Sequence, residues 1–239
     1  MKFITLDTIV NDILSIVRGS IVSQSEPISK RQIEDWINQY RSILLKRDLD
    51  KGKYPNPDFI QEIPFVELEE VPVEGDTLAS GYSGYTFTGS NVLRTKLSIP
   101  KPIDFNFKNG FTFIGKPDGT ELQIVPEHRA RWQQYKKYTS SEQLVYHKND
   151  HLYVTNAGLS DLSHLYIRGI FEIPSEVGRF VNPATDIAYF NESSKYPVPA
   201  NLVPAIKEFI LSKELQIETS APSDTKNDDA HGVAQNVER

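Results

Sequence analysis

The sequence predicts an α+β fold: a helical bundle with an inserted antiparallel β-rich domain and an extended C-terminal tail. Near both ends of the 239-residue chain, apolar residues recur every three to four positions, the spacing of amphipathic helices. Between those segments the period falls to two, the spacing of β-strands. We therefore divide the chain into a helical hairpin (1–56), a β-rich insertion (57–185), a closing helix (186–217) and an assembly tail (218–239).

The first predicted helix covers residues 6–18. Gly19 follows it, and a glycine in this place is typical of a helix C-terminus. The residues expected to form its buried face are Leu6, Ile9, Val10, Ile13, Leu14 and Val17. A short connection, 20–27, leads to the second helix, so we expect the two helices to pack antiparallel.

The second predicted helix begins at a capping box, in which Ser29 is followed three residues later by Gln32. Gly52 ends it. Its apolar stripe is expected to be buried against the first and last helices and comprises Ile33, Trp36, Ile37, Tyr40 and Leu44. The last predicted helix covers 202–215, with Asn201 as its cap and Pro204 in its first turn, where proline is tolerated.

In the central region, alternating apolar residues flank Asn109 and Gly110, a strong signal for a β-hairpin. A second turn at 117–119 precedes another apolar run. These signals predict a three-stranded meander over 103–125. Further strands are expected at 60–67, 92–99, 143–147, 151–155 and 165–173.

A basic and aromatic cluster lies in a predicted short helix at 126–138. Its members are Arg129, Arg131, Trp132, Tyr135, Lys136 and Lys137. The favoured interpretation is an amphipathic helix with Trp132 buried and the cations in water. The alternatives are a protein contact and a nucleic-acid contact, because such mixtures grip phosphates and stack on bases.

Composition excludes several classes of protein. The chain has no cysteine, which rules out disulfides, thiolate zinc sites and cysteine nucleophiles. Its apolar runs are too short for a membrane-spanning helix, and we expect no signal peptide at its start. The net charge of −6 argues against a protein that coats DNA.

The charges come in blocks. Residues 54–93 hold seven acids and no Lys or Arg, whereas 94–137 hold nine basic residues and four acids. One interpretation is ordinary solvated surface. The other is that acidic and basic faces of neighbouring subunits meet and set their orientation.

Candidate reactive groups are few. His147 and His151 flank a predicted turn and are expected to face each other across two strands, without an evident third metal ligand. The glycine-rich stretch within 74–90 lacks the Gly-Lys-Ser/Thr ending of a phosphate-binding loop. Its aromatic residues Tyr82, Tyr85 and Phe87 suggest a contact loop instead. We expect no catalytic, cofactor-binding or metal-binding residues, no cofactor, and no enzymatic activity.

The stretch 25–37 (SEPISKRQIEDWI), continued by Tyr40, Arg41 and 48–53 (DLDKGK), resembles the N-terminal region of tail-connector proteins. The closest resemblance is to structural ring proteins of crAss-like short-tailed phages. The segment 196–199 (YPVP) before the closing helix fits the same layout.

The resemblance implies a structural subunit of a homo-oligomeric ring, usually a dodecamer, in the phage head–tail connector. Such a ring joins the portal to the tail and surrounds the channel through which genomic DNA is ejected, without sequence-specific binding. It implies contacts with the portal protein and other ring proteins, a tail that reaches the portal or a neighbour, no membrane partner, and a place in the virion after synthesis in the bacterial host cytoplasm.

An alternative is a tail-associated β-rich binding module, such as a fibre or spike adaptor that binds a receptor or carbohydrate. The aromatic loop at 82–87 motivates this alternative.

Overall fold

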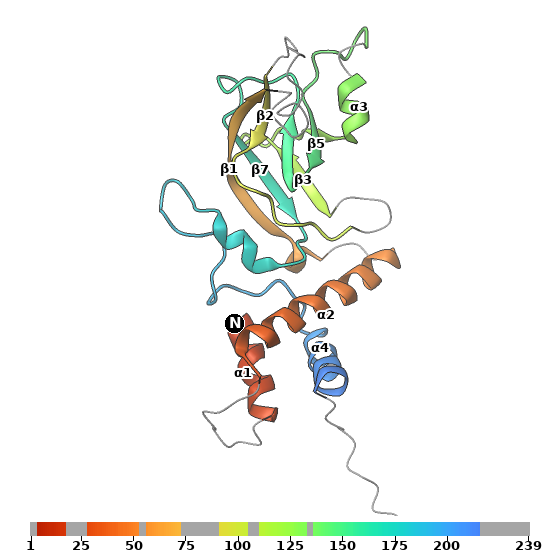
Figure 1. Cartoon of the computed structure of the whole chain (residues 1–239), viewed down its shortest axis with the longest axis vertical. Helices are drawn as coiled ribbons and strands as arrows, with labels where there is room; N and C mark the ends of the chain where they lie inside the picture. Colours follow the sequence, from red (N-terminus) through yellow and green to blue (C-terminus); the bar gives the residue numbers. More distant parts are fainter. Residues whose placement is uncertain are drawn as a thin grey trace, which may run out of the picture.

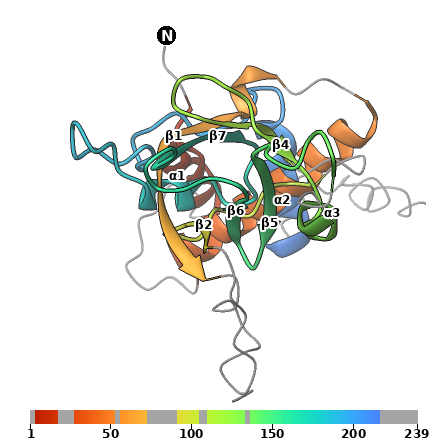
Figure 2. The same cartoon turned by 90° about the horizontal axis from the view of Figure 1, so that it is seen from above.

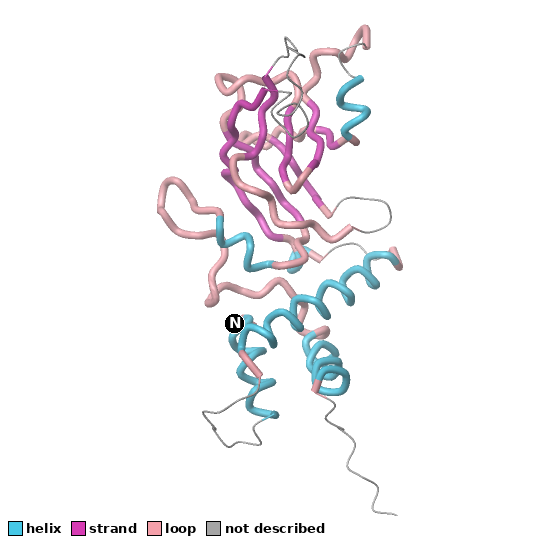
Figure 3. Tube along the Cα trace, viewed as in Figure 1, coloured by secondary structure: helices cyan, strands magenta, loops and turns pink. Residues whose placement is uncertain are grey.

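The computed structural model describes residues 4–17, 28–52, 56–72, 91–104, 110–132 and 136–215. Three helices lie at one end of an elongated molecule, and a curved β-sheet lies at the other (Figure 1; Figure 3). The predicted α+β class is confirmed. One continuous apolar core runs from the helices into the sheet.

At the helical end, α1 (Leu6–Val17) and α2 (Lys30–Asp50) lie where the apolar spacing predicted them. Ser29 caps α2, as predicted: the backbone N–H of Gln32 donates to its Oγ at 3.2 Å. The helices α1, α2 and α4 (Val203–Phe209) contact one another, and the ring of Tyr40 packs 5.7 Å from that of Phe209.

The apolar stripe of α2 is buried except at Trp36, which is half-buried and packs at the margin of the core. The prediction that Trp36 is buried is therefore only partly correct. Ile33 and Ile37 of the same stripe are 0% exposed.

The closing helix lies within one residue of its predicted bounds, but its cap and its last turn differ from the prediction. Leu202, not Asn201, is its N-cap, and no side chain caps it. Pro204 lies in the first turn and has no N–H for a capping side chain to satisfy. After α4 the chain continues as a π-helical turn, η5 (Ile210–Glu214).

Seven strands form one sheet in the order β3-β7-β1-β2-β6-β5-β4. They are β1 (Gln61–Pro72), β2 (Asn91–Thr95), β3 (Phe111–Gly115), β4 (Gln123–Ile124), β5 (Leu144–Lys148), β6 (His151–Val154) and β7 (His164–Gly169). A bridge between Gly115 and Glu121 joins the two ends of this order, so the sheet is nearly closed (Figure 2). The pair β4–β5 is parallel, which corrects the prediction of a purely antiparallel insertion.

The predicted meander over 103–125 is only partly present. Its second turn is confirmed, since Lys116 N–H donates to the carbonyl of Thr120 and Gly119 has a φ of 90°. The main partner of β3, however, is β7 from much later in the chain. Ile103 likewise donates its N–H to Ile170. Residues 105–109 of the first predicted hairpin lie outside the described residues.

The long strand β1 pairs with two other strands. Gln61 to Glu67 pair with β7, and Leu68 to Pro72 pair with β2. The register shifts between Ile63 and Val66, a bulge that bends the strand. This bend lets one strand contribute to both halves of the curved sheet.

A buried arginine joins the helices to the sheet. Arg41 of α2 is 0% exposed, and its Nε and Nη1 donate, each at 2.7 Å, to the carbonyls of Pro197 and Phe171. Its guanidinium lies 5.7 Å from the ring of Tyr196, whose hydroxyl donates to Asn38 at 2.7 Å. Burial lowers the pKa of Arg41 to about 10, so the side chain stays charged at neutral pH.

Candidate functional site

The predicted basic and aromatic cluster lies at the sheet end of the molecule. Its helix, α3 (Glu127–Trp132), is shorter than predicted. Ala130 is the helix residue buried against Val125 and Leu144. Trp132 is 67% exposed, so the expectation that it is buried is wrong. A six-residue helix has room for one small residue in this core, and Trp132 follows two positions later, on another side of the helix.

The structure adds Tyr138 to this cluster, a residue that the sequence analysis missed. Its side chain is 85% exposed, and Lys137 Nζ lies 5.3 Å from its ring centroid. Tyr135 and the side chain of Arg131 lie outside the described residues. The sequence shows a tyrosine next to two lysines, but no local pattern indicates that this tyrosine is exposed.

The two histidines do not face each other. A two-residue turn at Asn149 and Asp150, both with positive φ, pairs Lys148 with His151 and His147 with Leu152. The two rings therefore lie on opposite faces of the sheet. Among the described residues, no three His, Asp or Glu side chains gather closely enough to hold a metal ion.

Each histidine has a local role in the sheet. His151 Nδ1 lies 2.7 Å from the carbonyl oxygen of Thr95. His147 packs edge-on against Phe111, with ring centroids 5.9 Å apart, and burial lowers its pKa. These contacts favour a structural role for both side chains.

Part of the acidic block is neutralised within the subunit. Glu69 pairs with Arg94 and Glu67 with Lys96, across the β1–β2 pair. The third pair joins Glu62 to Arg168 at 2.7 Å, across the β1–β7 pair. Exposed pairs of this kind add little stability. Asp58, another member of the acidic block, pairs with Lys195. At least four carboxylates of the block therefore already have partners in their own chain.

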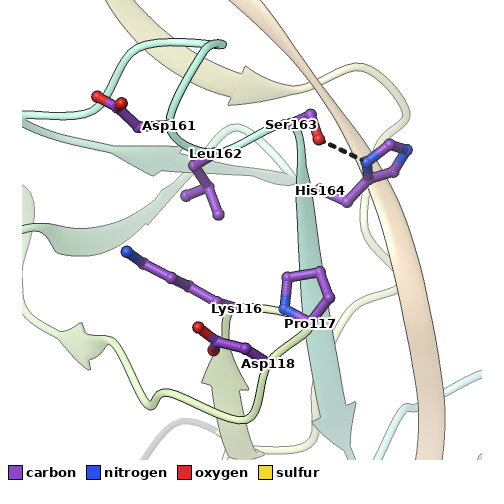
Figure 4. Close-up of a pocket in the computed structure, with 7 residues that line it drawn as sticks. All are labelled: Lys116, Pro117, Asp118, Asp161, Leu162, Ser163 and His164. Carbon is purple, nitrogen blue, oxygen red and sulfur yellow. Dashed lines mark hydrogen bonds between the residues drawn. The ribbon is translucent and has the colours of Figure 1, made fainter.

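One hollow of about 260 Å³ lies between the turn after β3 and the start of β7 (Figure 4). Ser163 Oγ lies 2.9 Å from His164 Nδ1 there. A nucleophilic serine needs a histidine that a third group orients. Asp118 and Asp161 both point away from His164 in Figure 4. Asp118 instead accepts the backbone N–H of Thr120, which lowers its pKa.

A hairpin at 181–188 projects from one side of the molecule, just after the short helix η4 (Pro174–Arg179) (Figure 1). Val181 is 41% exposed and Ile187 is 59% exposed. This hairpin is not among the sites predicted from the sequence. The available signals were Asn182 followed by proline and Asp186 shortly after, all typical turn residues.

The hairpin is held by its own backbone. Val181 bridges to Ala188, and Asn182 N–H donates to the carbonyl of Ile187 at 2.9 Å. Asn182 also closes the tip, since its carbonyl accepts the N–H of Asp186 and its side chain accepts that of Ala184. The stem is fixed to the core by Phe180 and Phe190, which are both buried.

The family model for phage tail ring protein 2, from crAss-like phages, matches residues 8–237. The chain belongs to this family. The match covers the helices, the sheet and the projecting hairpin alike. No curated protein matches the sequence.

A phage tail ring protein is a structural component of the virion that assembles with other tail components. Among the described residues of this ring protein, Asn182 holds a turn, His151 contacts a neighbouring strand and Arg41 joins the helices to the sheet. None of its described helices combines the length and apolar character needed to cross a bilayer.

Proposed function

We propose that this chain is a subunit of a homo-oligomeric ring, a dodecamer, in the phage head–tail connector. The ring joins the portal to the tail and surrounds the channel through which DNA is ejected. The observation that carries this proposal is the match to the tail ring family over nearly the whole chain.

The structure supports an assembly role in a second way. Four exposed apolar and aromatic side chains lie on projections: Val181 and Ile187 on the hairpin, and Trp132 and Tyr138 around α3. Exposed residues of this kind are typical of surfaces that bind other proteins. The buried polar groups, such as Arg41, hold the subunit together instead.

We propose a separate role for each part of the chain. The helical hairpin (1–56) and the closing helix (186–217) form a bundle, and the β-rich part (57–185) projects from it. The contacts among α1, α2 and α4 support this bundle. The tail (218–239) and the aromatic loop at 82–87 lie outside the described residues, and we propose that the tail is an assembly arm that reaches the portal or a neighbouring subunit.

DNA passes through the proposed channel without sequence-specific recognition. The net charge of −6 fits a channel that does not hold DNA tightly, because tight binding relies on cations that neutralise phosphates. The proposed partners of the subunit are further copies of itself, the portal and other ring proteins.

The copy number in purified virions tests this proposal. Quantitative mass spectrometry should give one copy of this chain per portal subunit, and mild disassembly should release it with the portal and tail rings. Release with fibres or spikes, at a different ratio, would favour the alternative of a fibre or spike adaptor and overturn the connector role.

Deletion of 219–239 tests the assembly arm. The truncated subunit should keep its melting temperature, because few residues of this segment are apolar. It should also fail to enter virions. Normal incorporation and infectivity would overturn the role of the tail.

A further inference from the structure

The hairpin at 181–188 and the C-terminal half of α2 lie on opposite sides of the subunit. Figure 1 and Figure 2 both show the hairpin on one side and the end of α2 on the other. A closed ring needs two different surfaces of this kind, because each copy must contact its two neighbours head to tail.

The two surfaces are chemically complementary. The hairpin offers Val181, Ile187 and the single acid Asp186, all exposed. The end of α2 offers Ile43, which is 52% exposed, and the exposed cations Lys46 and Arg47. One exposed acid, Asp50, follows a turn later, so the cations outnumber the exposed acids on this face. Positions 43, 46 and 47 are spaced by three and four, so they share one face of the helix.

We infer that the hairpin of one copy docks on the Ile43, Lys46 and Arg47 face of α2 in the next copy of this chain. Ile187 and Val181 contact Ile43, and Asp186 pairs with the cations. This inference deepens the proposed ring and rests on it.

The hairpin suits this role because it is already ordered in the free subunit. Its internal hydrogen bonds, centred on Asn182, fix the loop before any partner binds. A preformed loop loses less conformational entropy on binding. The hairpin is small beside the roughly 800 Å² per partner that a stable interface buries, so it forms one part of the contact between copies.

Disulfide trapping tests the contact directly, because the chain has no cysteine of its own. The full chain carrying both Ile43→Cys and Ile187→Cys should, on oxidation, give a ladder of trimers and larger species on non-reducing gels. Each single variant should give none. A matched control pairs Ile187→Cys with Leu159→Cys, another exposed apolar position, and should give no ladder.

Sedimentation of the native sequence separates the possible failures. If the native chain self-associates but the double variant gives no ladder, the hairpin contact is overturned and the ring stands. If the native chain stays monomeric at every concentration, the homo-oligomeric ring and the hairpin contact both fail. A ladder in the Leu159→Cys control equal to that of the double variant would also overturn the contact.

A charge variant provides an independent measurement. Asp186→Asn removes the carboxylate while keeping a residue type that tolerates the φ of 54° at this position. Self-association should weaken by about threefold at low salt, and the difference should vanish at high salt, as for other exposed ion pairs. Ile187→Asp should weaken it by about tenfold or more. The control Asp161→Asn should change nothing, and equal effects from all three would overturn the contact.

Discussion

The junction around Arg41 and the hairpin at 181–188 differ in what their polar and apolar groups contact. At the junction a charged side chain is fully buried and donates to carbonyls 130 and 156 residues away in sequence. In the hairpin, apolar side chains are exposed and the hydrogen bonds close within eight residues. The first arrangement stabilises one subunit. In the second arrangement, the exposed apolar side chains contribute little to the stability of the subunit. They remain available to contact a partner.

Replacing Arg41 should give the largest effect on subunit stability. Arg41→Met leaves two buried carbonyls without donors, and each such group costs about 1–3 kcal/mol. We therefore expect a loss of about 2–6 kcal/mol in the free energy of unfolding, measured by urea denaturation. Arg47→Met, at an exposed site on the same helix, serves as the control and should cost under about 0.5 kcal/mol. Similar losses in the two variants would show that the buried contacts are unimportant.

The margin of the helical core lies between these extremes. Ile37 is fully buried, and Ile37→Ala should cost about 2–5 kcal/mol. Trp36 is half-buried, so Trp36→Ala should lower the free energy of unfolding by about 1–3 kcal/mol. This loss is smaller than the loss usual for a fully buried tryptophan. Denaturant unfolding of both variants measures the difference. A larger loss for Trp36→Ala would mean that the indole belongs to the centre of the core.

The cap of α2 should contribute about 1 kcal/mol. Ser29→Ala removes the acceptor for the Gln32 N–H, and losses near this value are usual for N-cap residues. Ser15→Ala, within the exposed face of α1, is the matched control and should change stability by under about 0.5 kcal/mol. An unchanged melting temperature in Ser29→Ala would count against this cap.

Tyr40 makes stability depend on alkaline pH. Its hydroxyl donates to Glu214, and this hydrogen bond raises the pKa of Tyr40 to about 12. Because the folded pKa lies above the unfolded value near 10, the contribution is complete below pH 10 and is lost as pH rises through 12. The melting temperature of the native chain should exceed that of Tyr40→Phe at pH 9 and converge with it at pH 12. An equal difference at both pH values would contradict this linkage.

The hairpin should give the smallest effect on the isolated subunit. Ile187→Ser removes an exposed side chain, so the free energy of unfolding should change by under about 0.5 kcal/mol. The measurement is made at a concentration where the chain is monomeric. A loss above about 1 kcal/mol in the free energy of unfolding would mean that Ile187 contributes to the core, and the difference from Arg41 would then not hold.

The sequence was a good guide to elements that local spacing defines. The capping of α2 by Ser29, the buried face of α1 and most strand positions follow from patterns within a few residues. The resemblance motifs also acquire a physical reason: Arg41 and the segment 196–199, far apart in sequence, meet at the buried junction.

What the sequence left open depends on long-range geometry. The hairpin signal near Gly110 favoured neighbours in sequence, whereas β3 pairs with β7. A one-residue difference in turn length placed His147 and His151 on opposite faces. The exposure of Trp132 and Ile187 depends on where the sheet curves and where the chain leaves the core, which no local pattern encodes.

The path of the chain through the helical end has a consequence for the order of folding. Arg41, Tyr40 and Asp12 find partners at Phe171, Glu214 and Lys207, so the first helices cannot complete their contacts until residues beyond 200 have been synthesised. Contacts between such distant segments slow folding and prolong the exposure of apolar faces. We therefore expect the apolar stripes of α1 and α2 to stay exposed while the rest of the chain is being synthesised. Uncovered stripes on different newly made chains can bind one another before the C-terminal segment is complete, so aggregation competes with folding at high concentrations of this chain.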